Sequence, residues 1–252
     1  MLTQDLETKT TAIAQPQLYG LSATHLVDFE ANVKGSINDY RESLLLEPRT
    51  LKAFLSLKQA ALIAGFDLCI CSAYRNFDRQ LAIWNAKARG QRALLDNNSQ
   101  PIVHENLSPD ELIDAILLWS ALPGASRHHW GTDLDVYDAN KITKAELQLV
   151  SHEYQLGGPC YALAQWLSLH GPEYGFYFPY QAGLSGVSPE PWHISYFPVA
   201  ACYLADYDSH DLIQLIAQSD ISPKAALLAR LSDIVDSHVR FVAPLPVLDP
   251  KP

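Results

Sequence analysis

The alternation of apolar and polar positions in the first part of the chain predicts two helices with a strand between them. Residues 48–65 (PRTLKAFLSLKQAALIAG) and 77–90 (FDRQLAIWNAKARG) show the apolar spacing of amphipathic helices. Pro48 suits a first helical turn, and a glycine at the end of each segment suits the position just past a helix end. Between the helices, residues 67–73 (DLCICSA) predict a strand.

Further helices are predicted in the second half of the chain. Ser108 and Glu111 form a capping signature at the start of a third amphipathic segment. Residues 158–171 (GPCYALAQWLSLHG) show the same helical spacing. The tail, residues 209–241, has the pattern of two helices that are broken at Ser222-Pro223.

Strands are fewer than helices in this pattern. Residues 131–138 (GTDLDVYD) alternate with period two, which predicts a strand, and residues 185–198 predict a loop that leads into a short strand. The aromatic residues 175–180 are expected to be irregular. Helices precede, separate and follow these strands, which is typical of an α+β fold. The polar residues 1–17 are predicted to be flexible and residues 18–252 to form one domain.

Composition and charge narrow the classes of protein. Of 252 residues, 48% are hydrophobic and 18% charged, which is ordinary for a globular chain. The net charge of -10 comes with no basic stripe, so we expect no nucleic-acid partner. The sequence has no run of about eighteen apolar residues that would span a membrane. It also shows no signal peptide, so we expect a cytoplasmic protein whose four cysteines are reduced.

Residues 126–138 (SRHHWGTDLDVYD) gather two histidines and three aspartates around one glycine. A solvated loop and a metal site are the two interpretations. A hydrolytic zinc site takes three protein ligands, usually imidazole or carboxylate, and keeps one position open. This segment offers candidates for two ligands, and residue chemistry alone does not choose His128 over His129 or Asp135 over Asp133.

Two further segments complete the candidate site. In EPWHISY, residues 190–196, His193 offers a third ligand, and Glu190 offers a base that can take a proton from water and return it to a leaving amine. In CSAYRNFDRQ, residues 71–80, Arg75 follows the predicted strand, and its guanidinium can bind a carboxylate in a fork. An arginine facing a zinc site indicates a substrate with a free C-terminal carboxylate, as in a carboxypeptidase.

These three blocks resemble the motifs of zinc-dependent D-alanyl-D-alanine carboxypeptidases of the VanY type. SRHHWGTDLD is similar to their Ser-x-His-x-x-Gly-x-x-x-Asp motif and EPWH to their Glu-x-x-His motif, while SAYRNFDRQ is similar to Ser-x-Tyr-Arg-Ser-x-x-x-Gln, with Asn76 in place of serine. The resemblance implies the Hedgehog/DD-peptidase fold, a small antiparallel sheet flanked by helices. It also implies one Zn²⁺ on His128, Asp135 and His193, with Glu190 as the catalytic base.

The remaining candidates surround these residues. Arg75 is expected to hold the substrate carboxylate or the developing oxyanion. Further substrate contacts are expected from Gln80, Ser126 and Tyr177, and support for the ligands from Asp133, His129 and Trp192. Asp133 stands where we expect a small or apolar residue, and a plain strand-end role is its alternative. Lys87 and Arg79 are expected to be solvated helix charges, and Tyr180 a packed aromatic residue.

The resemblance implies a peptidoglycan stem peptide as the substrate. In the expected cytoplasmic location, the reaction that fits is L,D-carboxypeptidase release of D-alanine from tetrapeptide muropeptides during cell-wall recycling. A D,D-carboxypeptidase acting on D-Ala-D-Ala pentapeptides is the near alternative. A non-catalytic zinc-containing binding module is the alternative of another class, and the presence of Glu190 argues against it. The oligomeric state is left open.

Overall fold

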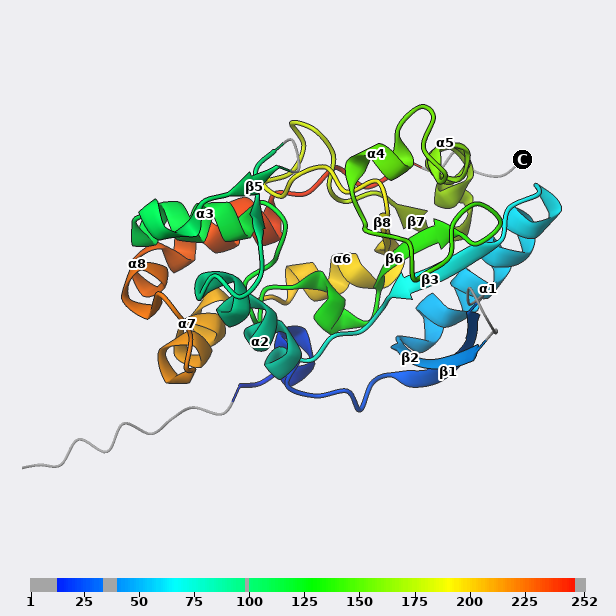
Figure 1. Ribbon diagram of the computed structural model, residues 1–252. Coiled ribbons are helices and arrows are strands. Elements are labelled where there is room, and N and C mark those ends of the chain that lie inside the picture. Colours follow the sequence, from blue (N-terminus) through cyan, green and yellow to red (C-terminus); the bar gives the residue numbers. More distant parts are fainter. Residues whose placement is uncertain (1–12, 34–39, 98–99, 248–252) are drawn as a thin grey trace, which may run out of the picture.

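Two groups of elements face each other in the computed structural model, which describes residues 13–33, 40–97 and 100–247. In Figure 1 a group of helices lies on the left and a small sheet with its covering helices lies on the right. The left-hand group consists of α2 (Phe77–Ala88), α3 (Pro109–Leu117), α7 (Ser209–Gln218) and α8 (Lys224–Ile234).

The sheet on the right has four antiparallel strands in the order β3-β6-β8-β7. Their bounds are β3 (Leu68–Ser72), β6 (Asp133–Asp138), β8 (His193–Tyr196) and β7 (Phe176–Tyr177). Every residue of β6 is buried, because this strand lies in the interior between β3 and β8. Leu134 and Val136 pack in one apolar cluster with residues of α1 (Pro48–Ile63) and α5 (Tyr161–His170), which leaves Asp133 and Asp135 on the opposite face.

A hairpin lies beside this sheet. Strands β1 (Val27–Val33) and β2 (Tyr40–Leu46) pair antiparallel, and α1 begins immediately after β2. The Glu47 carboxylate caps α1 by accepting a hydrogen bond from the backbone N–H of Thr50 at 2.8 Å. The same Glu47 donates its own backbone N–H to Gly131, so the start of α1 is tied to the turn that precedes β6.

The other elements connect these groups. Helix α6 (Phe197–Ala205) follows β8 directly and runs between the two sides in Figure 1. Short elements complete the described chain: β4 (Leu94–Leu95), β5 (Pro101–Ile102), α4 (Ser151–Tyr154), the 3-10 turns Pro16–Tyr19, His104–Asn106, Arg127–Trp130 and Gly171–Tyr174, and the π-helical turn Val235–Arg240.

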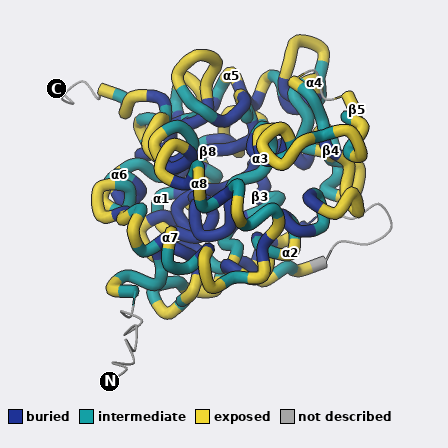
Figure 2. The backbone as a smooth tube through the Cα atoms, turned by 90° about the vertical axis from the view of Figure 1, so that its left-hand side faces the viewer, coloured by how far each residue is buried: buried dark blue, intermediate teal, exposed yellow. Residues whose placement is uncertain are grey.

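The apolar interior is divided in the same way as the elements. One cluster joins α2, α3, α7 and α8 around the fully buried Trp84 and Trp130. A second cluster lies between the sheet and α1 and α5, around Phe54 and Leu57. Figure 2 shows the buried stretches running through the interior, while outward turns of the helices are exposed. A third, smaller cluster forms around Tyr137, Tyr154 and Trp192.

The α+β class and the small antiparallel sheet flanked by helices are confirmed. The predicted helices and strands in residues 48–138 and the two tail helices are present, and β8 follows the expected loop. The prediction for residues 175–180 is wrong in part, because Phe176 and Tyr177 pair with β8 as a strand. The hairpins β1-β2 and β4-β5 were not predicted.

The expected flexible segment, residues 1–17, lies outside the described residues up to residue 12. A 3-10 turn begins at Pro16, and Leu18 and Tyr19 within it are buried against the helical cluster. Ordered structure therefore begins before residue 18. Cys69, Cys71, Cys160 and Cys202 are free thiols in the structure.

Gly131 provides a test of how tightly the turn before β6 is packed. Its φ is +71°, and a Cβ there would lie 2.4 Å from Leu26 Cδ2 and 3.0 Å from the Glu47 nitrogen. We expect Gly131→Ala to lower the free energy of unfolding by about 2–4 kcal/mol, through backbone strain and the clash together. Urea denaturation monitored by circular dichroism measures this.

The matched control is Gly183→Ala, because Gly183 has a φ of +72° and no atom within 4 Å of the added Cβ. It should cost only the backbone strain, about 1 kcal/mol. Equal losses for the two variants would show that the packing of Leu26 and Glu47 around Gly131 leaves room for a Cβ.

Candidate metal centre and active site

Three buried donors from separate elements meet on one face of the sheet. Asp135 on β6 lies directly opposite His193 on β8, so the antiparallel register makes them cross-strand neighbours. His128 comes from the 3-10 turn Arg127–Trp130 that leads into β6. One ligand atom from each residue lies within 4.8 Å of the other two, and within the described part of the chain this is the one such group of histidine, cysteine and carboxylate side chains.

The hydrogen bonds of the two imidazoles determine which nitrogen faces the cluster. His128 Nδ1 lies 2.9 Å from the Ala73 carbonyl oxygen and donates to it, which leaves Nε2 at 3.3 Å from Asp135 Oδ2. His193 Nε2 lies 3.0 Å from Asp133 Oδ1, which leaves Nδ1 at 3.2 Å from Asp135 Oδ1. Each histidine thus has one nitrogen held by the protein and one directed at the cluster.

These spacings fit a zinc ion. Four ligands at about 2.0–2.1 Å in a tetrahedron lie about 3.3 Å from one another. The two imidazole-to-carboxylate separations, 3.3 and 3.2 Å, have that length. Two imidazoles and one carboxylate are also a usual donor set for hydrolytic zinc, with a fourth position left for water. The residues present therefore fit one Zn²⁺.

The charge distribution also favours a cation at this point. Burial alone would lower the pKa of His193, but hydrogen bonds to Asp133 and Asp135 raise that pKa to about 10. Burial would raise the pKa of Asp135, yet His128 and His193 hold it well below its ordinary value. A proton on His193 therefore balances the carboxylates, and a metal ion on the same donors replaces it.

Asp133 supports His193 from the side away from Asp135. Its carboxylate accepts hydrogen bonds from Arg127 Nε at 2.7 Å and from Thr132 Oγ1 at 2.6 Å, and all three side chains are buried. Arg127 Nη2 also donates to Ser195 Oγ at 2.7 Å. An ionised carboxylate is stable in the interior only when it is paired in this way. The contacts place Asp133 against His193 and not against His128.

A cavity of about 370 Å³ opens beside the three donors, which is within the usual range for ligand pockets. Glu190, from the loop that precedes β8, lines it, and its carboxylate lies 3.5 Å from His193 Nδ1. Burial, opposed in part by His193, raises the pKa of Glu190 to about 7. A divalent cation nearby would lower this pKa, since its charge favours the carboxylate. Trp192, Tyr180 and Ser126 also line the cavity.

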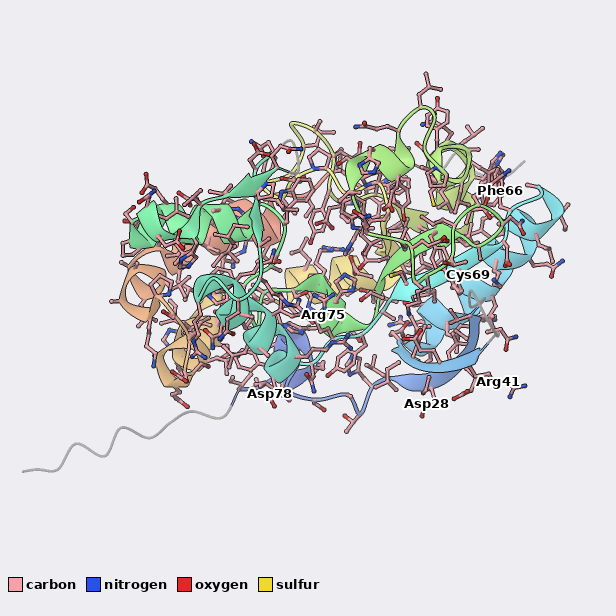
Figure 3. The ribbon with its side chains drawn as sticks, viewed as in Figure 1. Asp28, Arg41, Phe66, Cys69, Arg75 and Asp78 are labelled. Atoms are coloured by element: carbon pink, nitrogen blue, oxygen red, sulfur yellow. The ribbon has the colours of Figure 1, made fainter. Side chains whose placement is uncertain are left out.

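Arg75 lines the same cavity, and it lies at the junction between the helices and the sheet (Figure 3). Its Nη1 donates to Gln80 Oε1 at 2.7 Å and its Nη2 lies 3.3 Å from Ser72 Oγ. Its backbone N–H donates to the His128 carbonyl, and its own carbonyl accepts from His129 Nδ1 at 2.6 Å. Burial lowers the pKa of Arg75, with Asp135 acting against this shift.

Some expected roles do not match the positions of the side chains. Gln80 and His129 are fully buried and do not line the cavity: Gln80 bonds Arg75 and the Ala121 carbonyl, and His129 bonds Arg75 and the Gly124 N–H. Both therefore position Arg75. Tyr177 packs on Phe197, with ring centroids 6.0 Å apart, and is not part of the cavity wall either.

Two residues that we expected to be uninvolved do line the cavity. Tyr180, expected to be a packed aromatic residue, lines the cavity, and its ring centroid lies 4.8 Å from that of His193. Lys87, expected to be a solvated helix charge, faces the cavity from α2. The apolar spacing of α2 identifies a buried face, but it does not show that a polar hollow adjoins that face.

Three coordinating side chains, a carboxylate beside them and an arginine across a cavity are the parts of a metallopeptidase site. Residues 43–199 match the VanY family, D-alanyl-D-alanine carboxypeptidase, and the chain belongs to this family. The resemblance seen in the three motifs is confirmed. As members of this family are peptidases, the chain is an enzyme of the hydrolase class.

Individual relatives share about a third of their residues with this chain over the matched region. Two proteins of Haemophilus influenzae, both described as uncharacterized, share 32% identity over 121 residues and 33% over 105 residues with this chain. These matches cover 47% and 42% of this chain, and 92% and 67% of the relatives.

Solved structures that are similar include VanYB in complex with D-alanine-D-alanine, at 18% identity and a TM-score of 0.45, and the LdcB LD-carboxypeptidase, at 19% and 0.49. The matched regions cover 72% and 73% of this chain, and 87% and 74% of the VanYB and LdcB chains, respectively. None of the described helices is long and apolar enough to cross a membrane.

Asp133 can be tested through the affinity of the site for zinc. We expect Asp133→Asn to weaken zinc binding by about 10–100-fold, because the neutral amide no longer holds the His193 imidazole with a charged hydrogen bond. Titration against a chromophoric chelator measures the dissociation constant directly, on protein whose fold is checked by circular dichroism.

Asp138→Asn is the matched control on the same buried strand. Asp138 Oδ1 accepts hydrogen bonds from two backbone N–H groups, those of Asp67 and Asn140, and an asparagine oxygen can accept both. Zinc affinity should stay at the wild-type value there. Unchanged affinity in the folded Asp133→Asn variant would remove Asp133 from any metal-supporting role.

Proposed function

We propose that this chain is a zinc-dependent carboxypeptidase that releases a C-terminal D-alanine from peptidoglycan stem peptides. In the proposal one domain, residues 18–252, acts as an L,D-carboxypeptidase on tetrapeptide muropeptides in cell-wall recycling. The observation that carries it is the position of Glu190, which lies 3.5 Å from a metal-ligand atom in a cavity that also contains Arg75. A binding module without catalysis has no need of this carboxylate.

His128, Asp135 and His193 would hold the metal. Bound zinc supplies Lewis acidity, which polarises the scissile carbonyl group and acidifies a water molecule. Glu190 takes the proton of the attacking water and then delivers it to the departing amine. The loop that carries Glu190 is held at both ends for this task. The backbone N–H of Glu190 donates to the Tyr180 carbonyl, and the Glu190 carbonyl accepts from the backbone N–H of His193.

Arg75 holds the substrate in register with Glu190. Its guanidinium is fixed by Gln80 and Ser72, so little side-chain entropy is lost when it binds an anion. Ser126, which is 2% exposed, offers a hydroxyl on the same cavity wall. Trp192 and Tyr180 exclude bulk water from this space, which strengthens each charged contact.

The shape of the cavity supports the L,D bond over the D,D bond. Its wall continues past Arg75 to Lys87 on α2 and to Trp119, which leaves room beside the metal-ligand atoms for a long side chain. An L,D bond follows an L-residue that can carry such a side chain. A D,D bond follows D-alanine, whose methyl group would leave this part of the cavity unfilled.

Glu190→Gln tests the catalytic base. We expect a fall of about 10²–10⁴-fold in the rate of D-alanine release from a disaccharide tetrapeptide, because the amide cannot accept the proton. Zinc content, measured by atomic absorption, should equal that of the wild type. Glu105→Gln, at an exposed position outside the cavity, is the matched control and should retain full activity. Equal rates for the two variants would refute the assigned base.

The requirement for zinc and the preference for the L,D bond are tested together with a panel of substrates. Chelation should abolish D-alanine release, and stoichiometric Zn²⁺ should restore it. The zinc-loaded enzyme should cleave the tetrapeptide with a higher kcat/KM than the matching pentapeptide. A preference for the pentapeptide would replace the L,D assignment by the D,D alternative. If neither peptide is cleaved, the chain is better explained as a non-catalytic binding module.

A further inference from the structure

One wall of the cavity carries more positive charge than the proposed reaction uses. Arg75, Lys87 and Arg92 line it, whereas its acidic residues are Asp135 and Glu190. A bound divalent ion balances both carboxylates, which leaves the three cations without a counter-charge in the cavity. The whole chain has a formal charge of -10, so this concentration of positive charge runs against the general composition.

A single substrate carboxylate accounts for only one of these cations. Arg75 is attached to the turn that carries a metal donor, because its backbone N–H donates to the His128 carbonyl. It is therefore the cation for the C-terminal carboxylate of the peptide. Lys87 and Arg92 remain on the same wall, further along α2 and in the turn that follows it.

Among the described residues no carboxylate is in direct contact with Lys87, and Glu190 attracts its ammonium only from beyond ion-pair distance. The Lys87 ammonium makes no hydrogen bond or ion pair in the described part of the chain, although the side chain is partly buried. Burial, followed by the repulsion of Arg92, lowers the pKa of Lys87 to about 8. Keeping an ammonium in such a place costs free energy, and an anion supplied by a ligand would offset that cost.

Arg92 is brought beside Lys87 by the backbone. The chain turns back after α2, and the N–H groups of Gln91 and Arg92 both donate to the Ala86 carbonyl, at 2.8 and 3.1 Å. Arg92 also lines a second hollow, which shares Arg75, Ile83 and Arg92 with the cavity. The two cations therefore lie where a long substrate side chain would pass from the catalytic centre towards the surface.

We propose that Lys87 and Arg92 form a subsite for a second substrate carboxylate, carried by the side chain of the residue that precedes the released D-alanine. The proposal rests on the proposed carboxypeptidase function. It defines the substrate class as peptides with a long acidic side chain at that position, and it disfavours peptides in which the same side chain ends in an amide or an amine.

A matched pair of substrates tests this subsite. The two tetrapeptides are identical except that the side chain before the terminal D-alanine ends in a carboxylate in one and in a carboxamide in the other. We expect the wild type to favour the carboxylate by about tenfold or more in kcat/KM. In Lys87→Met and in Arg92→Gln this ratio should fall towards one, and further in the double variant.

Arg89→Gln is the charge-matched control, since Arg89 is exposed at the end of α2 and does not line the cavity. It should keep the wild-type ratio. Zinc content and thermal unfolding of each variant show that the metal site and the fold are intact. A wild-type ratio near one, or a ratio that survives both substitutions, would overturn the proposal.

Binding of the two product peptides separates this proposal from the proposed function, because it requires no turnover. Calorimetry on the zinc-loaded wild type should give a dissociation constant about tenfold lower for the acidic product than for its amide. Selective binding without cleavage of either tetrapeptide would retain the subsite and refute the carboxypeptidase. If both tetrapeptides are cleaved with equal kcat/KM and both products bind equally, the carboxypeptidase would be retained and the subsite refuted.

Discussion

Two carboxylates on a fully buried central strand are the constraint on which the rest of this structure depends. Asp133 is fully buried and Asp135 is 4% exposed, so each needs a positive partner. Arg127 supplies it for Asp133, and the cluster of His128, His193 and a cation supplies it for Asp135. His193 lies between the two carboxylates, which fixes its ring by one hydrogen bond on each nitrogen.

The remaining functional groups are attached to this strand through backbone contacts. The carbonyl of His128 accepts from Arg75, and His129 holds the Arg75 carbonyl, so a single turn positions both a metal donor and the arginine. The same turn ends at Gly131, whose carbonyl is tied to the start of α1. Metal donors and substrate-binding groups are therefore held in one hydrogen-bonded unit, as a site of sub-ångström tolerance requires.

Local patterns predicted most elements and a large part of the site, and the reason lies in the kind of information they contain. Periodicity specified α1, α2 and β6, because each buries one face over many residues. It did not identify β7, since a strand of two residues has no measurable period. The choice of His128 over His129 and of Asp135 over Asp133 came from the resemblance to the VanY-type motif. Residue chemistry alone left that choice open.

Contacts between distant segments could not be predicted in this way. Lys87 has the sequence context of a solvated helix end, and only the packing of α2 against the sheet turns its side chain towards a cavity. Tyr177 and Tyr180 are three residues apart in one aromatic segment, and only the pairing of β7 with β8 decides which of them faces His193. Gln80 was identified as functional, but its role through Arg75 depends on a hydrogen bond that no local pattern encodes.

The order of the strands has a consequence for how the active enzyme comes into existence. His193 and Asp135 are 58 residues apart in sequence, and Glu190 immediately precedes the strand that carries His193. Until β8 has been synthesised and has closed that long loop against β6, the chain lacks both a metal ligand and the base. Partly made or truncated chains that end before β8 thus lack His193 and are hydrolytically silent.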